Sequence, residues 1–180
     1  MRHRCRPVLV LALAIASLGL GCGYHVVHGG DARERLRPSL GTVTIADAVA
    51  ADLVLAGARE ALAQEGALGG AGDPRLVLEV TRIDESADSI SAQGGVPSAR
   101  GLTVAIVGRG LVTDTARANA LRDTGDMRAT VTRATPGDVR ADAFAHDDAV
   151  RAAAHRLGRK IALRALGEPV SSEDGEGRLP

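Results

Sequence analysis

Apolar residues return every three or four positions in two segments of the chain, which is the period of an amphipathic α-helix. The first segment covers residues 47–64, where Asp47 can cap the helix start and Gly66 can stop its end. The second starts at position 146 or 147 and runs to 166, with acidic residues in its first turn that suit the helix macrodipole. The stripes expected to be buried are Ala50, Leu53, Val54, Gly57, Ala58, Ala61 and Leu62 in the first helix and Val150, Ala154, Leu157, Ile161 and Ala165 in the second.

Other segments have the alternation or the composition of β-strands. Strands are expected at residues 24–27, 42–45, 76–83, 102–113 and 127–134. The connections expected between the elements are a flexible loop at 66–74, a long turn at 84–100 and a polar segment at 114–126. Gly108 and Gly110, inside the longest of these strands, predict a bulge or a strong bend.

This order of elements predicts an α+β fold in two layers. The longer strands are joined by turns, so they are expected to be antiparallel neighbours in a mostly antiparallel mixed sheet of about four to five strands. The two helices would cover one face of the sheet, because their alanine-rich stripes allow a close approach. The opposite face, which carries threonine and arginine, would then be open to water or to a partner.

The first 21 residues are typical of a secretory signal peptide. Three arginines precede an apolar run at residues 8–20, and this run is too short to span a bilayer. The alternative is a buried N-terminal helix of a cytosolic protein, which the charged flank and the short run argue against. Residues 22–168 are then the folded domain, and residues 169–180, which lack an apolar pattern, are expected to be a disordered acidic tail.

Cys22 follows Gly21 directly at the end of this leader. A bacterial lipoprotein site needs a cysteine there, because its thiol is alkylated by a diacylglyceryl group and the residue becomes the new N-terminus. Residues 20–22 resemble such a lipobox, although Gly19 stands where the usual pattern has leucine. Two or three acyl chains on one residue make the attachment effectively permanent. Cys22 is therefore the candidate lipid anchor, and the alternative is a free thiol in a turn of small residues.

The residues around Cys22 also indicate where in the cell the protein is located. Gly23, rather than aspartate, follows the anchor, which in many Gram-negative bacteria favours sorting to the outer membrane. Cys5 would be lost with the leader, so the mature chain would have no intramolecular disulfide.

Charge and aromatic content exclude a typical nucleic-acid-binding protein. The leader holds three of the 22 basic residues, so the remaining 19 stand against 22 acidic ones. Tyr24 and Phe144 are the only aromatic residues. A mildly acidic chain with almost no aromatic residues lacks both the basic stripe and the stacking platforms that nucleic-acid binding uses.

The sequence shows no arrangement of residues typical of an active site, so no enzyme activity, cofactor or metal is expected. The glycines near Gly108 lie in an expected strand rather than in a phosphate loop, and the glycine-rich residues 66–72 follow a helix, unlike a dinucleotide fingerprint. Residues 146–148, His-Asp-Asp, are the most metal-like cluster, but neighbouring helix residues cannot all face one ion, so a helix start is the better interpretation. The histidines interpreted as surface residues are His25, His28 and His155.

Residues 21–27, GCGYHVV, resemble the start of the LPS-assembly lipoprotein family (LptE-type), whose mature proteins often begin Cys-Gly-Tyr-His/Gln-Leu/Val. Residues 41–66 are similar to the family's second strand and first helix, residues 74–84 to a strand that ends in a charged residue, and residues 147–168 to its closing helix. The link after Ile45 is shorter than in the family.

The resemblance implies an outer-membrane lipoprotein, lipid-anchored on the periplasmic side. Such a protein would bind and help assemble the lipopolysaccharide-translocating β-barrel (LptD-type), acting as a plug and scaffold that supports lipopolysaccharide transport to the cell surface. The alternative function is a periplasmic-facing lipoprotein that binds a lipid or another envelope component and has no barrel partner.

Five arginines in the expected strands and turns are candidates for contact with the barrel or with lipopolysaccharide phosphates, because guanidinium groups match phosphate geometry well. They are Arg82, Arg100, Arg109, Arg128 and Arg133. None of them is assigned from the family, and the alternative for each is a solvated position that keeps the protein soluble.

Overall fold

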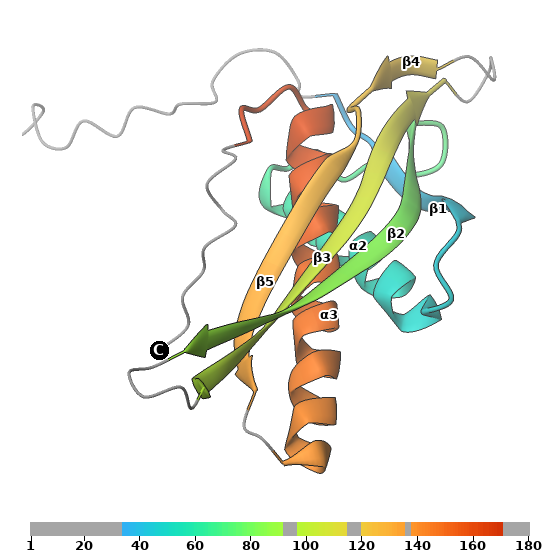
Figure 1. Cartoon of the computed structure of the whole chain (residues 1–180). Helices are drawn as coiled ribbons and strands as arrows, with labels where there is room; N and C mark the ends of the chain where they lie inside the picture. Colours follow the sequence, from blue (N-terminus) through green and yellow to red (C-terminus); the bar gives the residue numbers. More distant parts are fainter. Residues whose placement is uncertain (1–33, 92–96, 115–119, 136–137, 171–180) are drawn as a thin grey trace, which may run out of the picture. The chain divides into compact units, whose positions relative to one another are not determined.

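The computed structural model describes residues 34–91, 97–114, 120–135 and 138–170, which form a five-stranded sheet with two helices against one of its faces (Figure 1). The elements are β1 (Arg37–Val43), α2 (Ala48–Gln64), β2 (Arg75–Ser91), β3 (Pro97–Thr113), β4 (Ala120–Asp123), β5 (Met127–Thr135) and α3 (Val139–Ala165). The predicted α+β fold is confirmed. The expected signal peptide, Cys22, the strand at 24–27, His25, His28 and residues 171–180 of the expected tail lie outside the described residues.

The sheet is mixed, with one parallel pair. The strand order is β1-β2-β3-β4, and β5 pairs with β3 as well. β1 runs parallel to β2, whereas β2, β4 and β5 are each antiparallel to β3. The core between the sheet and the helices is aliphatic, with Leu62, Leu76, Ile106, Leu157 and Ile161 among its fully buried side chains. Within the described ranges, no helix is long and apolar enough to cross a membrane.

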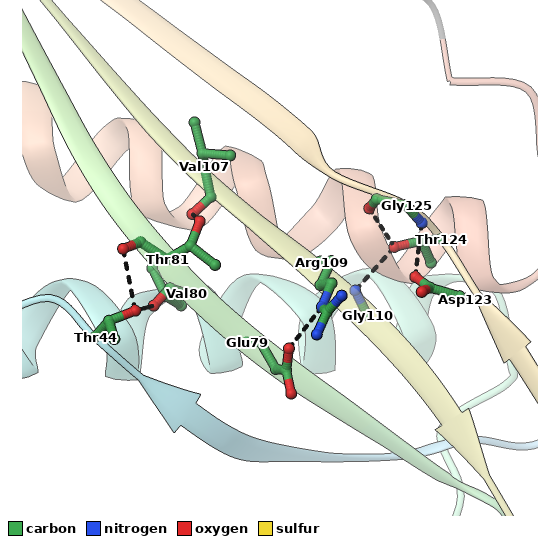
Figure 2. Close-up of polar contacts among 10 residues, drawn as sticks. All are labelled: Thr44, Glu79, Val80, Thr81, Val107, Arg109, Gly110, Asp123, Thr124 and Gly125. Carbon is green, nitrogen blue, oxygen red and sulfur yellow. Dashed lines mark hydrogen bonds and ion pairs between the residues drawn. The ribbon is translucent and has the colours of Figure 1, made fainter. Parts of the chain in front are cut away.

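A β-bulge at Thr81 decides which residues of β2 face the helices. The register of β2 on β3 shifts between Val80 and Arg82, which leaves Thr81 as the extra residue. Because side chains alternate along a strand, this extra residue places Ile83 on the helix side and Arg82 on the opposite side. The Thr81 hydroxyl donates to the carbonyl oxygen of Val107 at 3.1 Å, which ties the bulge to β3 (Figure 2). Of the bulge or strong bend expected at the glycines of β3, the structure shows a bulge in the partner strand β2, opposite Gly108 and Val107.

We expect Thr81→Val to lower the free energy of unfolding by about 1 kcal/mol, because it removes this hydroxyl while keeping the β-branched shape. Urea unfolding followed by circular dichroism measures the change. Thr42→Val, at an exposed position of β1, is the matched control and should have almost no effect. Equal stability of the two variants would show that the hydroxyl does not hold the bulge.

The predicted helix signals are confirmed for α2 and only in part for α3. Asp47 caps α2 by accepting from the Ala50 N–H at 3.0 Å, and Gly66, at φ +66°, follows its end. α3 begins at Val139, well before position 146, because Asp138 caps it. Residues 146–148 therefore lie inside the helix, and their interpretation as a helix start is wrong.

The expected buried stripes of the two helices are confirmed except at Leu53, which is only half-buried. The buried residues are Ala50, Val54, Gly57, Ala58, Ala61, Leu62, Val150, Ala154, Leu157, Ile161 and Ala165.

Three expected segment assignments are wrong. β1 begins at Arg37 rather than at position 42. Most of the expected long turn at 84–100 continues β2 and β3 into a long hairpin, and β4 lies inside the expected polar segment at 114–126. Backbone pairing can hold such polar residues in strands, because hydrogen bonds between strands do not require apolar side chains.

Glycines of β3 let α3 lie close to the sheet. A Cβ atom on Gly108 would lie 2.4 Å from the Glu79 carbonyl oxygen and 3.3 Å from Leu157 Cδ2. A Cβ atom on Gly110 would lie 2.5 Å from Ile161 Cγ2. Neither position can therefore hold a side chain unless the neighbouring strand or α3 moves away.

The two helices cross at a pair of glycines. A Cβ atom on Gly57 of α2 would lie 2.1 Å from the His155 carbonyl oxygen. A Cβ atom on Gly158 of α3 would lie 1.9 Å from the Val54 carbonyl oxygen. The backbones of α2 and α3 are therefore in direct contact, and the separation of the helices is set by the absence of these side chains.

Candidate functional site

The face of β2, β3 and β5 that points away from α2 and α3 is here named the open sheet face. Among the described residues, no helix or strand covers it (Figure 1). Directly opposed residues of antiparallel strands share a face, so the register places the side chains in rows across the strands. The rows are Glu79–Arg109, Arg82–Val107–Arg128, Asp84–Ala105–Thr130 and Ser86–Thr103–Thr132.

Two of the predicted arginines lie in one row, on either side of Val107. Neighbouring strands are about 4.8 Å apart, so the backbones of Arg82 and Arg128 are roughly 10 Å apart. The Arg82 side chain is 63% exposed, and its Nε donates to the Asp84 carboxylate at 3.2 Å. Arg128 is exposed, and no ion pair of Arg128 is found within the described part of the chain. The row therefore presents two accessible cations with an apolar residue between them.

Arg109 is held differently, because it is paired with Glu79 directly across β2 and β3 (Figure 2). The Arg109 Nε donates to Glu79 Oε2 at 2.6 Å, and the Glu79 side chain is only 17% exposed. This hydrogen bond, and then the negative charge of Glu79, raise the pKa of Arg109 above its usual value. The guanidinium therefore remains charged at every physiological pH, but its charge is balanced within the sheet.

Arg133 and Arg100 do not join these residues. Arg133 lies on the helix side of β5, where its Nη1 donates to Asp148 of α3 at 3.1 Å, and its buried Nε has no hydrogen-bond partner among the described residues. Arg100 pairs with Thr135 in the β3–β5 register, but its side chain lies outside the described residues. The structure thus brings together three of the five predicted arginines, with Arg133 turned to the other face.

Two histidines bind acidic residues of neighbouring elements. The Nε2 atom of His155 lies 2.9 Å from Glu60 of α2, and Arg159 donates to the same carboxylate at 3.0 Å. His155 therefore links the two helices and is not an isolated surface residue. His146 Nε2 lies 3.7 Å from Glu85 Oε1. The described ranges contain no group of three or more side chains that could hold a metal ion.

The sequence analysis did not predict the cross-strand rows, although the alternation of polar and apolar residues in β5 indicates one of them. In the sequence, Arg128 and Thr132 alternate with the apolar residues of positions 127–134, and both lie on the exposed side of β5. The Thr132 hydroxyl lies 3.0 Å from that of Thr103, within hydrogen-bond distance across the strands. Only the register between strands shows that these residues continue a surface formed by β2 and β3.

No protein-family model and no curated protein sequence matches this chain. Solved structures with a similar chain path include a minor lipoprotein from Acinetobacter baumannii, at 14% identity and a TM-score of 0.48, covering 75% of this chain and 94% of that one. The rare lipoprotein B from Shewanella oneidensis is similar at 13% identity and a TM-score of 0.43, covering 74% and 93% of the two chains.

A lipoprotein B from Nitrosomonas europaea is similar at 15% identity and a TM-score of 0.45. It covers 77% of this chain and 93% of its own. These neighbours are bacterial lipoproteins of low sequence identity. What this chain does is therefore inferred below from its own residues.

Proposed function

We propose that this protein is a lipid-anchored lipoprotein of the bacterial outer membrane that faces the periplasm and uses its open sheet face to bind an envelope partner. The observation that carries the proposal is the N-terminal sequence. A positively charged flank and an apolar run too short to span a bilayer lead to Cys22, directly after Gly21. A thiol in this position is the substrate of lipoprotein acylation.

The open sheet face supports a binding role rather than a catalytic one. Its rows combine exposed arginines with threonine hydroxyls and short apolar side chains, on strands that are paired along most of their length. Guanidinium groups form charge-assisted hydrogen bonds with phosphate and carboxylate oxygens. The partner that suits this surface is therefore a macromolecule or lipid with exposed anionic groups.

The specific partner we propose is the lipopolysaccharide-translocating β-barrel, which this lipoprotein would help to assemble. The resemblance of residues 21–27 to LPS-assembly lipoproteins supports this choice. The mechanism is non-covalent: a rigid domain packs into the barrel as a plug and scaffold, while the acyl chains keep it at the correct leaflet. Lipopolysaccharide phosphates would meet the row formed by Arg82, Val107 and Arg128.

Affinity purification of the full-length tagged protein from detergent-solubilised membranes tests this partner. A β-barrel recovered in equal stoichiometry supports the proposal. Recovery of the lipoprotein without a barrel supports instead a protein that binds a lipid or another envelope component alone. Depletion of the protein should also reduce barrel maturation and lipopolysaccharide at the cell surface, and unchanged levels of both would contradict the assembly role.

Charge reversal of the row should weaken binding to lipopolysaccharide. We expect the double variant Arg82→Glu, Arg128→Glu of the mature lipoprotein to bind immobilised lipopolysaccharide at least about tenfold more weakly, since two phosphate-facing cations become anions. Surface plasmon resonance at two salt concentrations measures the effect, which should shrink as salt screens the charges.

The matched control is Arg140→Glu, Arg151→Glu, which makes the same change in net charge at two exposed positions of α3. This control should retain most of the binding. Equal losses in the two double variants would mean that only net charge matters, and the row would then not be the contact surface.

A further inference from the structure

The parallel pairing of β1 with β2 ends well before β2 does. The last paired residues are Val43 and Val80, and β2 continues to Ser91. Thr44 closes the pairing, because its N–H donates to the Val80 carbonyl oxygen at 3.0 Å and its hydroxyl lies 3.1 Å from the carbonyl oxygens of Val80 and Thr81 (Figure 2). Beyond this point β2 pairs only with β3 among the described residues, so the edge that β1 would occupy is open there.

A cleft of about 450 Å³ lies beside the start of this open edge. It forms because β1 has ended and α2 begins only at Ala48, so neither element covers this part of β2. Apolar side chains of the β1–α2 connection, β2 and α3 line it, namely Ile45, Ile83 and Val150. The helix side of β2 and the N-terminal half of α3 thus border an open cleft along the strand edge, with these apolar side chains beside polar ones.

The charged and titratable residues that line the cleft are Asp47, Arg82, Glu85 and His146. Asp47 and Glu85 both line it, and Asp84 lies next to Glu85 on the other face of β2. His146 lies on the α3 side, with its Nε2 3.7 Å from Glu85 Oε1, and Arg82 is paired with Asp84. Asp47 caps α2 and Arg82 is paired with Asp84, so Glu85 is the charged group of the cleft that an entering basic group would meet.

We propose that this edge and cleft bind an extended segment of a partner protein by strand addition. The row of backbone N–H and C=O groups on an open strand edge can pair in register with another extended backbone, which determines the shape of the occupant. Alternate side chains of the added strand point to the helix side. One apolar side chain would contact Ile45, Ile83 and Val150, and a lysine or arginine two residues away would meet Glu85.

This inference goes beyond the function proposed above, because it concerns a different surface and holds whichever envelope protein carries the segment. The open sheet face offers side chains to a partner, whereas this edge offers backbone groups and a cleft that contains Glu85. Binding at the edge would add a strand in the position that β1 leaves after Val43.

The test uses the detergent-solubilised mature lipoprotein and a phage-displayed library of random linear peptides of about twelve residues. We expect enrichment of peptides with an apolar residue and a lysine or arginine at positions i and i+2. Chemically synthesised copies should slow hydrogen exchange of the β2 amides from Arg82 to Ser86, because a new ladder protects them. Proline at the position between the two anchors should abolish binding.

Two variants locate the site. Glu85→Lys should weaken peptide binding at least about tenfold, whereas Asp126→Lys, the same charge change at an exposed position that does not line the cleft, should leave it nearly unchanged. Ala46→Trp, at an exposed position lining the cleft, should block binding by filling it. Ala134→Trp on the exposed side of β5 is its control.

Three outcomes would overturn the proposal. The first is that no peptide is enriched over a matrix without the protein. The second is that the selected peptides bind wild type, Glu85→Lys and Asp126→Lys equally, or protect amides outside β2. The third is that peptides bind only after residues 23–33 are deleted, because the occupant would then be the chain's own N-terminal segment and not a partner.

Discussion

The variant Gly158→Ala is expected to lower the free energy of unfolding by about 3 kcal/mol, although alanine is the better helix former. Its Cβ atom would lie 1.9 Å from the Val54 carbonyl oxygen and 2.9 Å from the Ala58 nitrogen. Both are backbone atoms of α2, so no change of rotamer relieves the overlap and the helices must separate. Urea unfolding of the mature protein measures the loss.

Gly70→Ala is the matched control for this prediction. Gly70 lies in the loop after α2, no heavy atom lies within 4 Å of an added Cβ atom, and its φ is not in the left-handed region. Its stability should stay within about 0.5 kcal/mol of wild type. Gly57→Ala combined with Gly158→Ala should cost less than the sum of the two, because one separation of the helices accommodates both. Unchanged stability of Gly158→Ala would contradict the close crossing.

The second large effect is expected at the N-terminus. We expect Cys22→Ala to abolish acylation and to move the protein out of the membrane fraction, because each buried methylene of an acyl chain contributes about 0.8 kcal/mol of membrane binding. The variant should also retain residues 1–21, since lipoprotein processing requires the modified cysteine. Fractionation of cells followed by immunoblotting measures both changes.

Cys5→Ala is the control that this chain offers, because the sequence holds only two cysteines and Cys5 lies in the expected leader. It should be processed, acylated and recovered with the membranes like wild type. A Cys22→Ala protein that is still processed and still sediments with the membranes would show that another feature of the chain anchors it.

The sequence predicted those elements whose capping residues and apolar stripe indicate the same bounds. α2 has a cap at Asp47, a stop at Gly66 and a continuous apolar stripe, and its bounds were recovered closely. The first turns of α3 lack such a stripe, because Val139 and Phe144 point to solvent there. The cap at Asp138 follows a Thr-Pro-Gly sequence that is typical of a turn, so the helix start was placed too late.

The sequence analysis did not predict the full hairpin of β2 and β3, because local composition was again misleading. Residues 84–91 are rich in aspartate, glutamate and serine, a composition that favours turns. In the structure they are paired along their length with β3. The pairing depends on the partner strand that follows in the hairpin, and a pattern read within one segment carries no information about it.

The residues of the open sheet face were even harder to predict from a local sequence pattern. Strict alternation from Leu76, Leu78 and Val80 would place Arg82 on the helix side of β2. The extra residue Thr81 reverses this, so Arg82 joins Arg128 on the open sheet face. No local pattern predicts a bulge of this kind, because it arises from the register that best buries both Val80 and Ile83 against the helices.

Mass spectrometry of the N-terminal peptide of the mature wild-type protein, purified from membranes, tests the central claim most directly. The account predicts a peptide that begins at Cys22 and carries a diacylglyceryl group on its sulfur and an acyl chain on its amino group. An intact leader, cleavage at another residue or an unmodified cysteine at position 22 would contradict it.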